Sequence, residues 1–243
     1  MRKWCKLWQI GDTYKLCVFK YPPQKKEKAF QPFPFELLSD DEKAERLSQS
    51  LSRARRNVRE LLLCNSWQYF VTLTLRENRY DLHAFKKAFS VWVGNFNKKY
   101  NTKLQYVVIP EEHKDGATHA HGVFAGVPES ALCTNEHGYL TIPYYENRFG
   151  FISLSAIRDS RRCASYVAKY ITKKPHSQLK KGEQMFFASH GLKRAEPLGV
   201  WCLDEKLLPT EPHFQNEYVE ITAGEGEIPE PFKSLILWGH GGE

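Results

Sequence analysis

The sequence predicts an α+β fold, in which a central antiparallel sheet has its helices packed on one face. Three observations predict it. Short segments alternate apolar and polar residues with the two-residue period of a strand. Amphipathic helical segments are interspersed in the order strand, helix, hairpin, strand, helix, strand, which is typical of a mostly antiparallel sheet. An Asp-Gly pair at 115–116 separates two strand-like segments and indicates a hairpin.

The first part of the chain contains an arm and a long helix. Residues 1–38 are rich in aromatic residues, Lys and Pro, and we expect an irregular arm with one short strand at 14–21. Ser-Asp-Asp-Glu at 39–42 has the pattern of a capping box, which starts a helix. Apolar residues then recur at three- and four-residue steps, so the helix extends to about Cys64. The other face of this helix carries Arg46, Arg53, Arg55, Arg56 and Arg59.

The middle of the chain supplies the rest of the sheet. Residues 68–75 are β-branched and aromatic with strict alternation, which predicts a strand. The expected elements after it are a helix at 82–96, strands at 104–110 and 118–124 joined by a turn at 113–116, an excursion at 126–148 with a possible strand at 139–143, a strand at 149–157, a helix at 160–172 and a strand at 185–189. We therefore divide the chain into an arm (1–38), one folded domain (39–208) and an acidic, flexible tail (209–243).

Charge is distributed unevenly along the chain. The net charge is +7, but residues 46–104 hold 12 Lys and Arg against 3 acids, and residues 158–194 hold 10 against 2. From 195 onward the balance reverses, with 2 basic residues against 10 acidic ones. Two basic blocks indicate a polyanionic partner, most often a nucleic acid, although basic helix faces are also common as merely solvated surfaces.

Several classes of protein are excluded by what the sequence lacks. No apolar segment approaches the roughly 18 residues of a membrane span, and the first residues have no apolar core of a secretory signal. The six cysteines contain no C-x-x-C pair, so we expect reduced thiols with no catalytic or zinc-binding role. These features predict a soluble protein of the cytoplasm, with no membrane partner.

A candidate metal site lies on the predicted hairpin. His119 and His121 are two residues apart on one strand, so both imidazoles lie on the same face, about 6.5–7 Å apart along the strand. Folding about residue 115 places Glu111 opposite His119 and offers an oxygen ligand, and a shifted register would offer Glu112 or His113 instead. Two imidazoles and a carboxylate leave coordination positions free on a divalent ion. The alternative is a pair of hydrogen-bonded strand histidines.

A second group of reactive residues lies on the last predicted helix. Tyr166, Lys169 and Tyr170 have the spacing that places them on one helical face. A phenol with a pKa near 10 is a weak nucleophile, and a nearby ammonium or metal-bound substrate lowers the barrier to its attack. The alternative is that one tyrosine belongs to the core and the other to the surface.

Three motifs in this order resemble those of the HUH-superfamily rolling-circle replication initiators, especially of small single-stranded-DNA bacteriophages and related plasmids. They are Phe-Val-Thr-Leu-Thr at 70–74, His-Ala-His-Gly at 119–122 and Tyr-Val-Ala-Lys-Tyr at 166–170. The segments 108–111, 113–116 and 170–173 are also similar to that group. The resemblance covers about 53–197 and leaves out the arm and the tail.

The resemblance implies that the domain at 39–208 has an HUH endonuclease fold with an RRM- or ferredoxin-like central sheet. It implies that His119, His121 and Glu111 hold Mg²⁺ or Mn²⁺, and that Tyr166 attacks a DNA phosphate to give a 5′-phosphotyrosine and a free 3′-OH. It implies that Lys169 balances charge and leaves open whether Tyr170 is a second nucleophile. A hard cation also agrees with the absence of cysteine near the site.

The expected partners follow from this chemistry. They are single-stranded or hairpin origin DNA, a host DNA polymerase and, because no G-x-x-x-x-G-K-[ST] motif occurs here, a host helicase. Two alternatives are a transposase or relaxase with the same chemistry, and a non-catalytic module that binds single-stranded nucleic acid. The candidates for phosphate contacts are Arg53, Arg56, Lys86, Lys87, Arg161 and Arg162.

Overall fold

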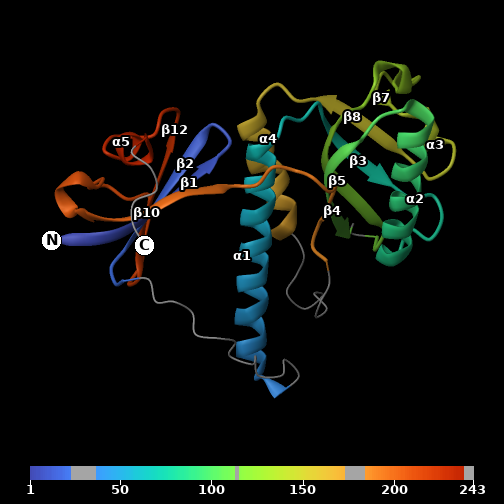
Figure 1. Cartoon of the computed structure of the whole chain (residues 1–243). Coiled ribbons are helices and arrows are strands. Elements are labelled where there is room, and N and C mark those ends of the chain that lie inside the picture. Colours follow the sequence, from blue (N-terminus) through green and yellow to red (C-terminus); the bar gives the residue numbers. More distant parts are fainter. Residues whose placement is uncertain (23–36, 113–114, 173–183, 238–243) are drawn as a thin grey trace. The chain divides into compact units, whose positions relative to one another are not determined.

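In the computed structural model the described residues are 1–22, 37–112, 115–172 and 184–237, and they form two compact units (Figure 1). Unit 1 combines Met1–Phe35 with Lys193–Glu243, and unit 2 is Glu36–Leu192. The division differs from the expected arm, domain and tail, because the two ends of the chain associate with each other. Within the described ranges, no helix has the length and apolar character needed to cross a membrane.

Unit 2 is built on a seven-stranded antiparallel sheet in the order β6-β7-β8-β3-β5-β4-β9. Its strands are β3 (Tyr69–Thr74), β4 (Gln105–Glu112), β5 (Thr118–Ala125), β6 (Cys133–Thr134), β7 (Leu140–Thr141), β8 (Ile152–Ala156) and β9 (Phe187–Ala188). Its helices are α1 (Asp40–Cys64), α2 (Leu82–Tyr100), α3 (Pro143–Glu146), α4 (Ser160–Ala168) and the 3₁₀ helices η2 (Glu129–Ala131) and η3 (Lys169–Thr172). The α+β class and the antiparallel sheet are confirmed.

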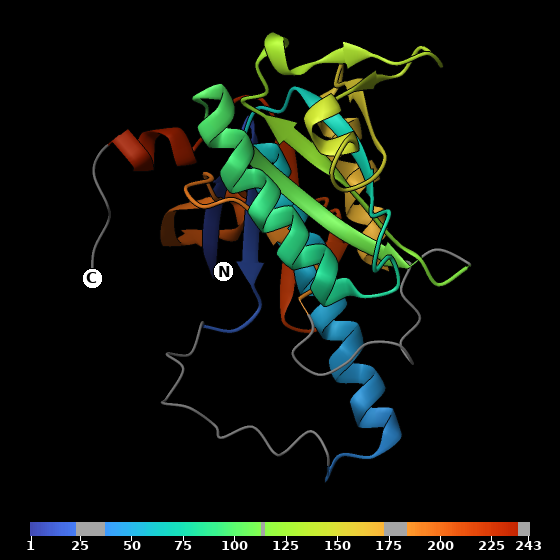
Figure 2. The ribbon, with the colours of Figure 1, turned by 90° about the vertical axis from the view of Figure 1, so that its right-hand side faces the viewer.

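The helices of unit 2 cover both faces of the sheet, whereas we expected them on one face (Figures 1 and 2). On one face, the aromatic residues of α2 pack on the odd-numbered residues of β3 in a core that includes Phe89, Trp92 and Leu73. On the other face, α1 and α4 pack on β4 and β5 through Val58, Val167 and other apolar residues. The two amphipathic stripes read from the sequence are therefore real, but they face opposite sides of the sheet.

Local signals set the ends of these helices. The Ser39 hydroxyl accepts from the Glu42 N–H, and the Glu42 carboxylate accepts from the Ser39 N–H at 2.8 Å, so the predicted capping box is confirmed. The Asp81 carboxylate caps α2, which ends at Asn101 in the left-handed conformation. The helix expected at 160–172 is an α-helix only to Ala168, after which the chain tightens into η3.

The strand register places polar residues together on the face covered by α1 and α4. Glu111 pairs with His119, His119 pairs with Thr74, and His121 pairs with Thr72, so the predicted hairpin register is confirmed. The same face carries apolar residues at the other end of β4 and β5, where Val107 and Val123 are fully buried beside α1. One half of this face is therefore hydrophobic core, and the other half carries the groups that can do chemistry.

Unit 1 is a five-stranded antiparallel sheet in the order β10-β1-β2-β12-β11. Its elements are β1 (Arg2–Ile10), β2 (Thr13–Phe19), β10 (Glu196–Asp204), η5 (Glu205–Leu207), β11 (Phe214–Gln215), β12 (Val219–Glu225) and α5 (Phe232–Leu237). One face buries Leu7, Leu16 and Trp201 against Phe232 of α5. The strand expected at 14–21 is therefore confirmed as β2, while β1 and the strands of residues 209–225 lie where we expected irregular chain.

Candidate active site

The ring of His121 is held from both of its nitrogens. Its Nδ1 lies 3.2 Å from the Thr72 hydroxyl, and its Nε2 lies 3.0 Å from a carboxylate oxygen of Glu111. In a neutral ring, Nε2–H donates to the carboxylate and Nδ1 accepts from the threonine. The side chains of His121 and Glu111 are only 15% and 19% exposed, so both groups are largely withdrawn from water.

Two tyrosines meet directly above this histidine. Tyr166, in the last turn of α4, and Tyr170, in η3, have their hydroxyl oxygens 2.7 Å apart, and Tyr170 is the donor. The Tyr170 ring stacks on the His121 imidazole with centroids 4.1 Å apart and an interplanar angle of 17°. The structure therefore brings together the tyrosines of the last motif and a histidine of the middle one, as their spacing predicted.

The two tyrosines differ in exposure. Tyr166 is 50% exposed, whereas Tyr170 is 6% exposed and belongs to the core beneath α1 and α4. Burial, followed by the hydrogen bond to Tyr166, raises the pKa of the Tyr170 phenol well above its usual range. Tyr170 is thus a protonated donor at neutral pH, and Tyr166 is the tyrosine whose oxygen faces solvent.

Phe70 completes a cluster of rings around the site. Its ring lies 5.5 Å from that of Tyr166, in an edge-on arrangement, and 6.1 Å from that of His121, nearly parallel to it. Phe70 is partly buried and packs against the α1 and α4 core. The first motif therefore contributes to the site through Phe70 and Thr72, which the sequence alone did not assign to it.

The predicted metal ligands share one region of the sheet. Glu111 and His119 are register partners, and Glu111 also contacts His121 on the same strand face. Two imidazoles and a carboxylate on adjoining strands suit a divalent cation, so the residues fit the implied metal. Among the residues the structure describes, however, no three His, Cys, Asp or Glu side chains are already grouped as a metal site.

The register also separates Glu111 from its alternatives. Glu112 is exposed and pairs with Thr118 rather than with a histidine. His113 lies outside the described residues. Of the alternative oxygen ligands, Glu111 is therefore the one placed beside both histidines.

The remaining predicted residues are all on the surface of unit 2. Lys169 is exposed at the start of η3, directly after the turn that carries Tyr166. Arg53 and Arg56 on α1 and Arg161 and Arg162 on α4 are exposed on the helices that cover the tyrosine side of the sheet. Lys86 and Lys87 lie on α2, which covers the opposite side (Figure 1). The candidates for DNA contact therefore fall into two groups, and only the group on α1 and α4 lies on the side of the site.

Comparison with known proteins gives one result. Residues 68–175 match the model of a family of replication-associated proteins, the ORF2 family. The match begins at β3 and includes Glu111, both histidines and both tyrosines. No curated protein and no solved structure matches the chain. The family match supports a role in DNA replication, as a replication initiator.

Proposed function

We propose that this protein is a metal-dependent, tyrosine-based endonuclease that nicks and rejoins single-stranded DNA at a replication origin, in the manner of the HUH initiators of phages and plasmids. The observation that carries the proposal is the convergence of Tyr166, Tyr170, His121 and Glu111 on one half of a sheet face. A nucleophile, a hydrogen-bond donor to it and metal-binding groups are the parts that phosphodiester transfer requires.

Tyr166 is the nucleophile in this proposal. Its oxygen bonds to the scissile phosphorus as the bond from phosphorus to the 3′-oxygen breaks, and the products are a 5′-phosphotyrosine and a 3′-OH. The phenolic proton leaves to solvent, to which Tyr166 is half exposed, and the departing 3′-oxygen takes up a proton from solvent. The phosphotyrosine conserves the energy of the broken bond, so attack by a 3′-OH restores the strand without ATP.

Tyr170 supports this step from behind. Because its hydroxyl donates to the Tyr166 oxygen, it stabilises the negative charge that develops there when the proton leaves. Stacking on His121 and burial in the core hold Tyr170 in the donor position. This arrangement assigns the two tyrosines different roles, with Tyr166 as the attacking residue.

His119, His121 and Glu111 would hold Mg²⁺ or Mn²⁺. When bound, the ion supplies positive charge at the phosphate oxygens, where negative charge accumulates during transfer. Glu111 and the Thr72 hydroxyl orient the His121 ring toward this position, because each binds one of its nitrogens. Lys169 and the arginines of α1 and α4 provide the positive surface along which the strand lies, outside the metal ligands.

The product explains the role in replication. The free 3′-OH is a primer from which a host polymerase extends, while a host helicase separates the strands. The family match at 68–175 supports this use of the chemistry over its use by transposases and relaxases.

The test is to trap the covalent intermediate. A randomised library of single-stranded DNA is incubated with the full chain and Mn²⁺, and protein-linked strands are isolated under denaturing conditions and sequenced. We expect a tyrosine-linked adduct with a shared sequence at its 5′ end, mapped by peptide mass to Tyr166 and abolished by EDTA. Tyr166→Phe removes the adduct, and Tyr170→Phe slows its formation by roughly 2- to 10-fold, the value of one hydrogen bond.

The matched control is Tyr139→Phe, which changes a tyrosine of similar exposure elsewhere in unit 2. It should form adduct at the wild-type rate. Undiminished adduct in Tyr166→Phe would contradict the assignment of the nucleophile. Tight binding of the library without any adduct would instead favour the non-catalytic binding module.

A further inference from the structure

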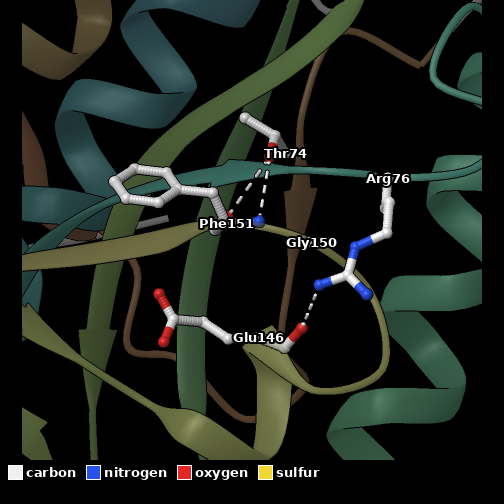
Figure 3. A pocket seen from close by; sticks show the side chains of 5 residues that line it. All are labelled: Thr74, Arg76, Glu146, Gly150 and Phe151. Atoms are coloured by element: carbon white, nitrogen blue, oxygen red, sulfur yellow. Dashed lines mark hydrogen bonds between the residues drawn. The ribbon is translucent and has the colours of Figure 1, made fainter. Parts of the chain in front are cut away.

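A pocket of about 410 Å³ opens at the end of β3, next to the candidate active site (Figure 3). It is lined by Thr74, Arg76, Glu146, Gly150 and Phe151. Its volume is within the range of small-molecule sites, about 300–1,000 Å³. None of these residues belongs to the predicted metal or nucleophile sets, so the pocket is a separate feature of the site.

The register places this pocket directly beside the metal-binding half of the sheet. Thr74 pairs with His119 on β5, and on its other side its N–H donates to the Phe151 carbonyl at 2.9 Å. Thr74 is two residues beyond Thr72, which contacts His121, so both lie on the same face of β3. A DNA strand bound at His119 therefore passes the mouth of the pocket.

The walls of the pocket are fixed by hydrogen bonds. The Thr74 hydroxyl accepts from the Phe151 N–H at 3.1 Å, and the Thr74 carbonyl accepts from the buried Tyr145 hydroxyl at 2.9 Å. At Gly150, a Cβ atom would lie 2.6 Å from the Thr74 carbonyl oxygen, so no side chain fits there. The pocket is preformed, because its backbone is held and the space above Gly150 stays empty of side chain.

The groups that face the pocket are those that recognise a nucleobase. Phe151 is 43% exposed, although it is a large apolar residue at the start of a strand. Arg76 donates one hydrogen bond to the Glu146 carbonyl at 3.1 Å, and a guanidinium has five N–H donors. The Glu146 carboxylate lies on the Phe151 side, away from that contact (Figure 3). The pocket thus offers an aromatic face, a donor and an acceptor.

We propose that this pocket binds one unpaired nucleobase of the DNA strand next to the scissile phosphate. The inference rests on the proposed function, which brings single-stranded DNA to this face. Phe151 stacks on the base, Arg76 donates to its ring nitrogen or carbonyl, and Glu146 accepts from its amino or imino hydrogens. A phosphate is a poor occupant, because the Glu146 carboxylate would repel it. The subsite therefore selects the sequence at which the strand is cut.

The test measures binding separately from cleavage. The full chain carrying Tyr166→Phe and Tyr170→Phe is titrated in EDTA with short single-stranded oligonucleotides, each rich in one of the four bases, and with an abasic strand of equal length. We expect Phe151→Ala to weaken binding of at least one base-bearing strand by roughly 5- to 150-fold, the range for loss of one stacked base. Binding of the abasic strand should not change.

Two further variants sharpen the result. Phe214→Ala is the matched control, because it removes a phenylalanine of similar exposure from unit 1, and it should change neither binding constant. Glu146→Gln keeps the size of the side chain but replaces an acceptor by a mixed donor and acceptor, and it should change the order of preference among the four bases. If Phe151→Ala weakens no base-bearing strand, or weakens the abasic strand equally, the subsite is wrong.

Failure of the subsite is distinguishable from failure of the proposed function. With both tyrosines present, Phe151→Ala should still form the covalent adduct with the randomised library but lose the sequence preference at one position. Adduct with unchanged preference refutes the subsite alone. A base-dependent loss of binding without adduct in any protein refutes the nuclease and leaves the subsite standing.

Discussion

At the scale of single residues, Thr72 is an unusually suitable partner for a metal-binding histidine. A hydroxyl can both donate and accept, so Thr72 can give a hydrogen bond to Nδ1 of a neutral His121 or receive one from Nδ1–H. The second case applies when Nε2 is a metal ligand, because the ring proton must then be on Nδ1. The same contact therefore orients the imidazole before and after a metal binds.

This contact gives the first prediction. Thr72→Val keeps the shape of the side chain but removes the hydroxyl, and we expect Mn²⁺ affinity to fall by about 10- to 100-fold, as for other outer hydrogen-bond partners of metal ligands. Thr72→Ser should restore most of it. The measurement is titration of free Mn²⁺ by electron paramagnetic resonance, which does not depend on nicking. Equal affinity in the valine and serine variants would contradict the role.

The residues that the sequence identified are those related by short, regular spacings. His119 and His121 follow from the two-residue period of a strand, Glu111 from the symmetry of a hairpin, and Tyr166 and Tyr170 from the period of a helix. Thr72 is 49 residues from His121, and its contact depends on which strands become neighbours in the sheet. That pairing is decided by tertiary packing, and no local pattern in the sequence reports it.

At the scale of elements, β5 is the strand on which the site depends, since it lies between β3 and β4 and carries both histidines. Gly122 lets it fit there. A Cβ atom on Gly122 would lie 2.1 Å from the Val107 carbonyl oxygen and 2.9 Å from the Val108 Cα. The glycine that follows the His-x-His pair is thus required by the close approach of β4.

The second prediction concerns this approach. Gly122→Ala forces β4 and β5 apart, and we expect it to lower the free energy of unfolding by about 1–3 kcal/mol or more, and to weaken Mn²⁺ binding because Glu111 moves with β4. The control is Gly94→Ala on α2, where no atom lies within 4 Å of the added methyl group. It should stabilise the protein by up to about 1 kcal/mol, since alanine is the better helix former.

Denaturant unfolding followed by circular dichroism measures both variants. Similar changes in the two proteins would contradict the packing argument, because only Gly122 has backbone in the way. An intact Mn²⁺ affinity in a destabilised Gly122→Ala protein would separate the sheet contact from the metal site.

The elements of unit 2 could be predicted well, but not their layers. Periodicity identified α1, α2 and the strands β3, β4, β5 and β8 to within a few residues, because each buries one face. An amphipathic stripe shows that a helix has a buried side, but not which face of the sheet it covers. The placement of α2 opposite α1 and α4 is decided by which residues of β3 to β5 meet each helix, as the two separate cores show.

At the scale of the whole molecule, the acidic end of the chain complements the basic beginning. Residues 1–22 hold five Lys and Arg against one Asp, whereas residues from 195 onward are strongly acidic. The Lys3 ammonium lies 2.7 Å from the Glu205 carboxylate and 3.6 Å from that of Glu220, within unit 1. Charge blocks that the sequence placed in an arm and a tail thus belong to one sheet. The sequence did not predict this, because β1 and β10 pair across almost the whole chain.

This ion pair gives the third prediction. The hydrogen bond from Lys3 lowers the pKa of Glu205 below its ordinary 4.5, so the pair stabilises unit 1 above that pH and is lost as the pH falls through the lowered value. The pKa of Lys3 is raised above 10.5 by the hydrogen bond to Glu205, so in base the same contribution is lost as the pH rises through the raised value. We expect hydrogen exchange of the β1 amides to speed up in acid relative to those of β5.

The comparison is between neutral pH and about pH 3, with β5 as the internal reference within each sample. Lys3→Met keeps the length of the side chain without its charge. It should speed exchange in β1 already at neutral pH and remove most of the change between the two conditions. A constant ratio of β1 to β5 exchange in the wild-type protein would show that the ion pair contributes nothing to unit 1.

The pairing of β1 with β10 and of β2 with β12 has a consequence for synthesis on the ribosome. The β1 and β2 hairpin emerges first, yet its inner face, with Leu7 and Leu16, gains its cover only when residues 196–232 have been made. All of unit 2 is translated in between, so unit 2 can fold while the hairpin still exposes two unpaired edges. The last part of unit 1 to leave the ribosome is thus the part that protects the first strands from association with other nascent chains.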